Sequence, residues 1–128
     1  MAIKVGDTYE WVFDTAQTDL SIFTVGATER LDVSYAQVNC TNSNLADVPV
    51  RLGMATATLP TVTKNSATGN AGMVLSHPGI SSGVPAIAGN GSAVIARGAL
   101  GADLRLTCGT PTYGELRIVV QCQLLTDQ

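Results

Sequence analysis

The chain has 128 residues, of which 45% are hydrophobic and 13% charged, and its formal net charge is −3. This length corresponds to one domain, and the hydrophobic content is too high for a disordered chain. The seven basic residues are dispersed along the sequence, which argues against a nucleic-acid partner. No stretch reaches the ~18 apolar residues of a membrane-spanning helix.

The low charge content also says something about the surface. Seven basic and ten acidic side chains must solubilise an area on the order of 6,000 Å². Interface cores are depleted in charged residues, so such a surface suits a protein that works against neighbouring molecules. The alternative is a neutral, Thr-rich surface of the kind found on many extracellular β-proteins. The first residues, MAIKVGD, lack an apolar core, and we expect no signal peptide there.

Residues 1–19 are the least regular part of the chain, and we expect an N-terminal strand or arm there, followed by a single β-sandwich domain over residues 20–128. Tyr9, Trp11 and Phe13 recur with a period of two, which is typical of a strand. They belong either to a core strand or to an extended arm whose aromatic side chains anchor on a partner.

A period of two continues along the rest of the chain and predicts strands. Apolar residues alternate with polar ones in five segments: residues 20–25, 31–35, 48–54, 104–108 and 116–124. After residue 35 the apolar positions shift to Val38 and Cys40, which predicts a bulge near Ala36 and Gln37. Pro49 places its strand at a sheet edge or at the start of a strand.

Turn-forming residues separate these strands. They lie at residues 42–44, 77–79, 81–83 and 89–91, with a long loop at 60–70 and a hairpin loop at 109–114. Seven or eight short strands predict an all-β fold, an antiparallel β-sandwich of the jelly-roll or immunoglobulin-like kind. The predicted core consists of Leu31, Val33, Val50, Leu52, Ile95, Leu104, Leu106, Ile118 and Val120.

The chain has three cysteines, Cys40, Cys108 and Cys122. Because this number is odd, they cannot form a complete set of disulfides within the chain. Free cysteine commonly acts as a small buried hydrophobic residue, and we expect three buried thiols. The alternative is a Cys108–Cys122 disulfide across the predicted hairpin. With no C-x-x-C pair and a single histidine, His77, we predict no metal site.

Candidates for catalysis are equally scarce. His77 precedes a proline in a predicted turn, so a solvated loop residue is the stronger interpretation than the base of a Ser-His-Asp site. Glu10, Glu29 and Glu115 are expected at strand ends or turns, where solvated acids are more common than paired catalytic carboxylates. The segment 89–92 is Gly-rich but lacks the lysine of a phosphate-binding loop. We therefore predict a binding or structural protein, with no catalytic residue and no cofactor.

The order of motifs resembles that of small β-sandwich virion proteins of tailed bacteriophages, in particular capsid decoration (cement) proteins. A paired-strand unit is followed by a Gly-rich turn, an A-D-x-L strand and a closing strand. The matching segments are residues 38–42 (VNCTN), 48–52 (VPVRL), 87–92 (IAGNGS), 97–106 (RGALGADLRL) and 116–120 (LRIVV).

This resemblance covers roughly residues 30–125 and implies a virion structural role, commonly as a homotrimer on a capsid lattice. It implies the major capsid protein or another virion protein as partner, synthesis in the host cytoplasm, and a place on the capsid exterior. A neck, tail or fibre accessory domain that binds a receptor or glycan is the alternative. The partner-binding residues we predict are Tyr9, Trp11 and Phe13 in the N-terminal segment and Thr61, Thr63, Lys64 and Asn65 in the long loop.

Overall fold

The computed structural model describes residues 3–40, 48–55, 73–80, 86–109 and 115–126, and these residues form ten β-strands and no helix. The strands are β1 (Ile3–Val5), β2 (Thr8–Phe13), β3 (Gln17–Phe23), β4 (Glu29–Cys40), β5 (Val48–Ala55), β6 (Met73–Ile80), β7 (Ala86–Gly89), β8 (Ala96–Arg97), β9 (Asp103–Cys108) and β10 (Leu116–Thr126). The predicted all-β class is confirmed. The strand count exceeds the prediction because the first nineteen residues hold two complete strands.

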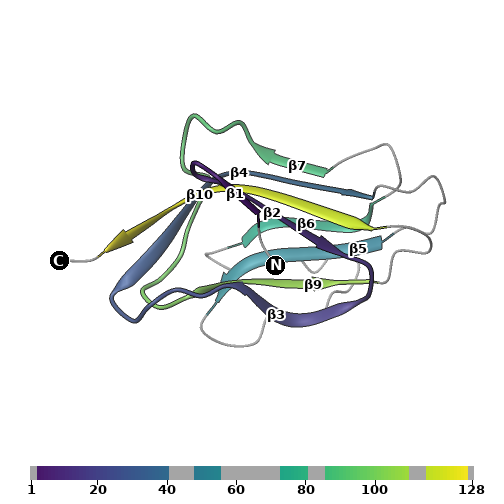
Figure 1. The fold of residues 1–128 in the computed structure, drawn as a ribbon, viewed down its shortest axis with the longest axis horizontal. Helices are drawn as coiled ribbons and strands as arrows, with labels where there is room; N and C mark the ends of the chain where they lie inside the picture. The colour runs from purple at the N-terminus through teal and green to yellow at the C-terminus, as the bar shows by residue number, and fades with distance from the viewer. Residues whose placement is uncertain (1–2, 41–47, 56–72, 81–85, 110–114, 127–128) are drawn as a thin grey trace.

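The strands form two antiparallel sheets that share one hydrophobic core (Figure 1). Sheet A has the order β1-β2-β10-β4-β7, with β8 also paired to β4, and sheet B has the order β3-β9-β5-β6. β4 and β10 are the long strands of sheet A and pair along their whole length, from Leu116 opposite Cys40 to Thr126 opposite Glu29.

The strand pairs are nested about the β5–β6 hairpin. β5 pairs with β6, β4 with β7 and β8, β3 with β9, and β2 with β10. Successive pairs alternate between the sheets, so a single long antiparallel ribbon is wrapped into two layers. This is the jelly-roll topology, and it distinguishes the fold from the immunoglobulin-like alternative, in which the two sheets are divided differently.

The predicted shift in apolar parity along β4 is present. Gln121 pairs with Tyr35 and Cys122 with Val33, which leaves Ser34 as the extra residue of a β-bulge. The bulge lies two residues before the predicted position. It allows Val33 on one side and Ala36 on the other to face the same core.

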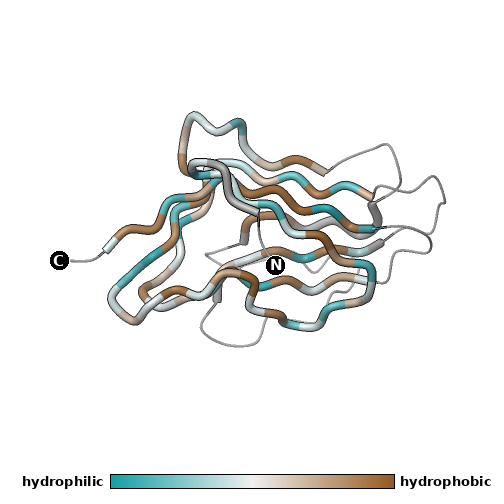
Figure 2. Tube along the Cα trace, viewed as in Figure 1, coloured by the Kyte–Doolittle hydropathy of each residue, from teal (hydrophilic) through white to brown (hydrophobic). Residues whose placement is uncertain are grey.

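The core follows the predicted alternation almost throughout. Figure 2 shows hydrophobic and hydrophilic residues alternating along the strands. Eight of the nine predicted core residues are completely buried, namely Leu31, Val33, Val50, Leu52, Leu104, Leu106, Ile118 and Val120. The prediction is wrong for Ile95, which is exposed, because Ala96 is the residue that pairs with Val33 and faces inward.

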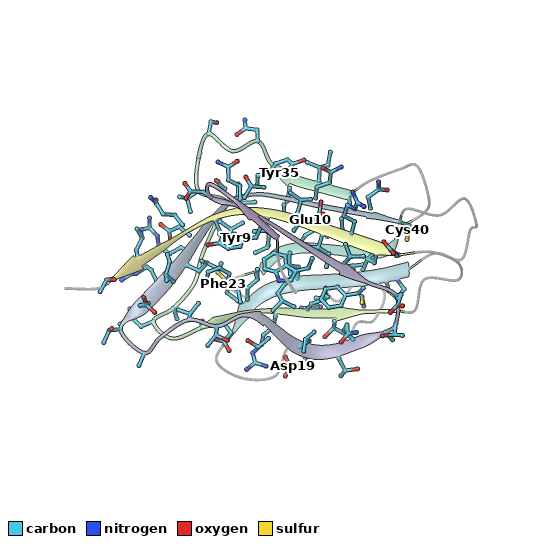
Figure 3. All side chains as sticks on the ribbon, in the orientation of Figure 1. Tyr9, Glu10, Asp19, Phe23, Tyr35 and Cys40 are labelled. Carbon is cyan, nitrogen blue, oxygen red and sulfur yellow. The ribbon has the colours of Figure 1, made fainter. Side chains whose placement is uncertain are left out.

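The N-terminal aromatic segment forms a strand inside sheet A, since β2 lies between β1 and β10. Trp11 is only 4% exposed and belongs to the core, and Tyr9 and Phe13 pack against it. Tyr9 stacks on Trp11 and meets Phe23 edge-on, with ring centroids 5.9 and 5.0 Å apart (Figure 3). The boundary expected between residues 19 and 20 falls within β3.

Two predicted turns differ from the structure. Residues 77–79, expected as a turn, lie within β6. β9 and β10 were expected to form a hairpin, but β9 belongs to sheet B and β10 to sheet A. β9 and β10 are therefore not hairpin partners, and a Cys108–Cys122 bridge across a hairpin has no counterpart in this fold. The predicted loop at 109–114 lies mostly outside the described residues.

The cysteines are three buried free thiols, as predicted. Burial raises the pKa of Cys40. Burial also raises the pKa of Cys108, to which Cys40 adds a smaller effect in the same direction while a backbone hydrogen bond at Gln17 opposes it. Both thiols therefore favour the neutral form in the folded chain.

Candidate binding surface

Sheet A is the larger of the two sheets, with six strands against four. Cross-strand pairing sets its side chains in rows: Glu10 lies opposite Val119, Val119 opposite Gln37, and Gln37 opposite Ile87. We define the sheet A outer face by the outward-facing residues on the part of these four strands between the bulge and Cys40, together with the adjacent loop: Thr8, Glu10, Val12, Tyr35, Gln37, Asn39, Ile87, Ile95, Arg117, Val119 and Gln121. The Asp32–Arg97 ion pair and Gln123 lie beyond the bulge and do not belong to it.

Charge is nearly absent from the sheet A outer face. Its charged members, Glu10 and Arg117, lie on neighbouring strands with Arg117 Nη1 3.8 Å from Glu10 Oε2, so their charges largely offset each other. Elsewhere on this face the Tyr35 hydroxyl donates to Gln37 Oε1 at 2.9 Å. A partner that covers this face would therefore have to remove water from few charged groups.

The outward side of sheet B differs in this respect. Arg105 Nη1 lies 3.2 Å from Asp19 Oδ2 and donates to the Asp19 carbonyl, and Asp103 accepts hydrogen bonds from Ser21 and from the Val25 amide. These contacts fasten β3 onto β9. The charged groups of sheet B thus hold its own strands together, whereas the sheet A outer face as defined carries a single ion pair, Glu10–Arg117.

Exposed aliphatic residues gather along the β7–β8 edge of sheet A. Ile87 is 57% exposed and Val94 49%, and Ile95 is also exposed. Ile95 lies against Gly89, where an added Cβ would come within 3.0 Å of Ile95 Cγ2. Because Gly89 has no side chain, Ile95 and Ile87 can share one apolar strip at this edge.

The segment that carries this strip is fixed to β4. The Gly91 amide donates to the Ser34 carbonyl at 3.0 Å, and the Ile95 amide donates to the Val33 carbonyl at 2.7 Å. Gly89 has φ +76°, and a Cβ there would lie 2.4 Å from the Ser34 oxygen. The predicted turn at residues 89–91 is thus confirmed, and it needs glycine both for its left-handed backbone and for its close approach to the bulge.

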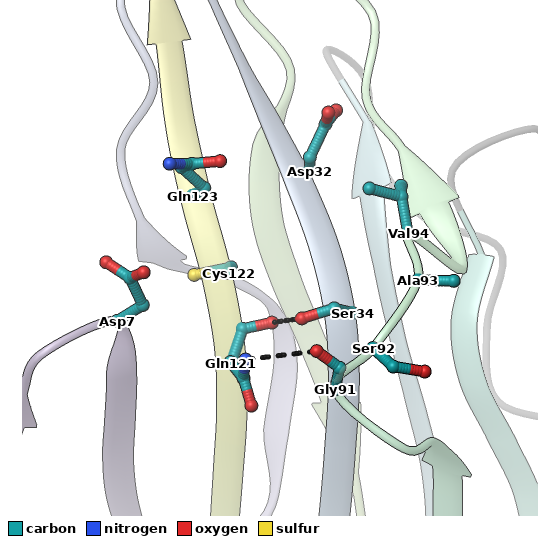
Figure 4. A pocket seen from close by; sticks show the side chains of 10 residues that line it. All are labelled: Asp7, Asp32, Ser34, Gly91, Ser92, Ala93, Val94, Gln121, Cys122 and Gln123. Carbon is teal, nitrogen blue, oxygen red and sulfur yellow. Dashed lines mark hydrogen bonds between the residues drawn. The ribbon is translucent and has the colours of Figure 1, made fainter.

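A cleft of about 220 Å³ crosses β10 and β4 at the bulge (Figure 4). Gln121, Gln123, Asp32 and Ser34 line its floor. Asp7 bounds one side, and the segment from Gly91 to Val94 bounds the other. The side-chain Nε2 of Gln121 donates to the Gly91 carbonyl at 3.4 Å, and the Ser34 hydroxyl donates to the backbone carbonyl of Gln121 at 3.3 Å. The cleft therefore combines polar groups on β10 and β4 with apolar groups on the Ala93 and Val94 side.

One carboxylate in this cleft already has a partner. Asp32 is 5% exposed and accepts two hydrogen bonds from the Arg97 guanidinium, each 3.0 Å long. The hydrogen bond and charge of Asp32 raise the pKa of Arg97. This fork-like pair is the geometry in which arginine binds carboxylate most specifically. Asp7, in contrast, is exposed at the opposite side of the cleft.

The structure distributes the predicted partner-binding residues unevenly. Trp11 is a core residue, and Tyr9 and Phe13 are half-buried against the core. Of the two alternatives for this segment, a core strand and an extended arm, the structure shows the core strand. Thr61, Thr63, Lys64 and Asn65 lie outside the described residues. Ile87, Val94 and Ile95, the most prominent exposed apolar residues at this edge, were not predicted as binding residues.

The acids and the histidine considered for catalysis do not come together into a described site. Glu10 pairs with Arg117, Glu29 Oε1 accepts a hydrogen bond from the Gly26 amide, and Glu115 is exposed before β10. His77 lies in β6. Within the described ranges no three His, Cys, Asp or Glu residues lie close enough together to hold a metal ion.

A scan against protein-family models, a search of curated proteins and a search of solved structures each found no match to the chain. In the part of the chain that the structure describes, there is no helix with the length and hydropathy needed to cross a membrane.

Proposed function

We propose that this chain is a structural protein of a tailed-bacteriophage virion, which binds the exterior of the assembled capsid as a decoration or cement protein. The observation that carries the proposal is the sheet A outer face, a nearly uncharged surface with exposed aliphatic residues on a jelly-roll framework. The motif order of residues 30–125 gives this binding role its biological setting. The fold alone would not, because a jelly roll serves many functions.

The mechanism follows from mass action. A protein that binds the assembled shell and not its separated subunits stabilises the shell, as any ligand of a native state does. Ile87, Val94 and Ile95 supply apolar area at one edge of the face, and burial of apolar area contributes roughly 25 cal/mol per Å². Because the face has no unpaired charge, a partner can cover it without the free-energy cost of desolvating one.

A binding assay with matched variants tests the proposal. Ile87→Lys places a charge at the β7 end of a row of the sheet A outer face. Leu100→Lys makes the same change at another exposed residue, in the turn beside Glu29 at the far end of β4. In co-sedimentation with purified capsids, we expect Ile87→Lys to bind at least tenfold more weakly, and Leu100→Lys to bind like the unchanged chain. Equal binding by both variants would exclude this face, and no capsid binding by the unchanged chain would exclude the cement role.

We further propose that the chain acts together with copies of itself, three in a closed ring as the resemblance implies. A closed ring uses up its contact surfaces and does not extend into filaments. Sedimentation equilibrium at micromolar concentration should give a mass of three chains of 13.2 kDa, or of six where two rings associate. A stable single chain at that concentration would contradict the ring.

The cleft at the bulge favours a second candidate function, an accessory domain of the neck, tail or fibre that binds a glycan. Gln121, Gln123, Ser34 and Asp7 offer amide, hydroxyl and carboxylate groups, which hydrogen-bond sugar hydroxyls. Screening the protein against a glycan array tests this function. Binding that is lost in Gln123→Ala, with capsid binding absent, would favour it over the cement role.

A further inference from the structure

β10 continues beyond the strand that flanks it. β2 pairs with β10 from Leu116 to Gln121, and the Cys122 amide makes one more bond, donating to the Asp7 carbonyl at 3.0 Å. From Gln123 to Thr126, β10 pairs with β4 on one side, and no described strand pairs with it on the other. In Figure 1 this end of β10 projects past the end of β2 toward the C-terminus.

The direction of the backbone groups at this open edge follows from alternation. In an antiparallel strand, successive residues direct their N–H and C=O groups to opposite neighbours. Cys122 directs its amide toward the β2 side. Leu124 and Thr126 therefore direct their N–H and C=O groups to the same side, where β2 is no longer present. Gln123 and Leu125 direct theirs to β4.

Leu124 lies at this edge and is exposed, although it is on the inward-facing side of β10. Leu124 continues the inward-facing series of Leu116, Ile118, Val120 and Cys122, which are at most 3% exposed. Leu124 itself is 40% exposed. An additional strand along this edge would satisfy the free backbone groups and cover Leu124 at the same time.

The edge has none of the usual protection against pairing. Natural edge strands are commonly guarded by lysine, proline, a bulge or an inward-pointing charge. The segment Gln-Leu-Leu-Thr at 123–126 contains no charged residue and no proline, and the bulge opposite lies in β4, before this segment. The opposite flank of the ribbon is covered, since β8 pairs with β4 and the Gly98 and Gly101 amides donate to the Leu31 and Glu29 carbonyls.

We infer that the open edge of β10 at residues 123–126 pairs with the same edge of a second copy of this chain, in antiparallel orientation about a two-fold axis, to join two A sheets into one. A second copy is the occupant that the edge itself suits. Two-fold contacts bring the same segment against itself, and a neutral segment meets no like charge in doing so. The contact does not depend on the proposed capsid role. By itself it gives an assembly of two copies, and together with a three-copy ring it gives an assembly of six.

Removing one edge-facing amide tests the inference. Leu124→Pro deletes an N–H that points to the open edge and leaves the Gln123 and Leu125 amides free to pair with β4. Leu124→Val keeps the N–H and serves as the matched control. Sedimentation equilibrium of the purified chain should give an even number of copies for the unchanged chain and for Leu124→Val. For Leu124→Pro we expect at least a tenfold weaker two-fold association.

Thr126→Lys provides a second variant, because Thr126 is exposed and its replacement leaves the core unchanged. It should weaken association as Leu124→Pro does. Hydrogen exchange supplies the direct readout: the amides of Leu124 and Thr126 should exchange more slowly as protein concentration rises. A single chain or an odd number of copies, or exchange at these two amides that is independent of concentration, would overturn the inference, whatever the outcome of the capsid assays.

Discussion

Replacing Trp11 with alanine measures how firmly the N-terminal segment belongs to the core. Trp11 is 4% exposed and sits in β2 between β1 and β10. A buried tryptophan removes on the order of 200 Å² from water, which corresponds to about 5 kcal/mol at roughly 25 cal/mol per Å². Measured Trp→Ala changes in cores cost about 3–5 kcal/mol. We expect a loss in that range, a large part of the ~5–15 kcal/mol stability of a typical domain.

Urea unfolding followed by circular dichroism is the assay, since Trp11 is the single tryptophan and its fluorescence is lost in the variant. With a slope of about 1–3 kcal/mol per molar urea, the midpoint should fall by at least ~1 M. Val12→Ala, one residue along and 40% exposed, is the matched control and should change stability by less than about 1 kcal/mol. Equal losses in the two variants, or a loss below ~1 kcal/mol for Trp11→Ala, would refute the assignment of this segment to the core.

Three further predictions concern the turn, the thiols and the buried ion pair. Gly89→Ala should lower the melting temperature clearly more than Gly6→Ala, because both have positive φ but only at Gly89 would a Cβ meet the backbone; equal shifts would contradict this. Burial raises the pKa of Cys40 and Cys108, so their contribution to stability is present below the ordinary thiol pKa of 9.0 and is lost as pH rises through the folded values. The free energy of unfolding should therefore decline above pH 9 less steeply in a Cys40→Ala/Cys108→Ala variant than in the unchanged chain. In a separate test, alkylation of the denatured, unreduced chain should count three thiols. Arg97→Ala should lower the melting temperature more than Arg117→Ala, since it leaves the buried carboxylate of Asp32 without its fork-like partner. The reverse order would contradict the claim that the burial of Asp32 makes its ion pair the more stabilising one.

The sequence predicted the core well because burial in a sandwich follows a period of two. The alternation along β4, β5, β9 and β10 identified their inward residues, and the shift of parity after residue 35 revealed the bulge. Its position at Ser34 could not be read from the chain, because a parity shift is equally consistent with an extra residue anywhere between Val33 and Val38.

Other features depend on which strands become neighbours, and local pattern carries little information on that. The turn chemistry at 109–114 is compatible with a hairpin, yet β9 and β10 belong to different sheets. Arg51 is a polar member of the alternating segment 48–54, yet it is 1% exposed. Ile95 is more apolar than Ala96, yet pairing with Val33 turns the alanine inward.

The candidate surface was the least predictable part. Its cleft joins residues near positions 7, 32, 92 and 122, which only the nested strand pairing brings together. The prediction that sparse charge signals an interaction surface pointed to a class of function but not to a face. The aromatic residues were the obvious anchors in the sequence, and the fold instead uses Trp11 to build its interior.

The heat stability of particles tests the cement role most directly. Virions whose genome encodes this chain would be prepared with the protein and stripped of it, and release of nucleic acid would be followed as temperature rises. The account predicts that the coated particles release their contents at a higher temperature, and that adding the purified chain back restores this temperature while Ile87→Lys does not. Release at the same temperature from coated and stripped particles would contradict it.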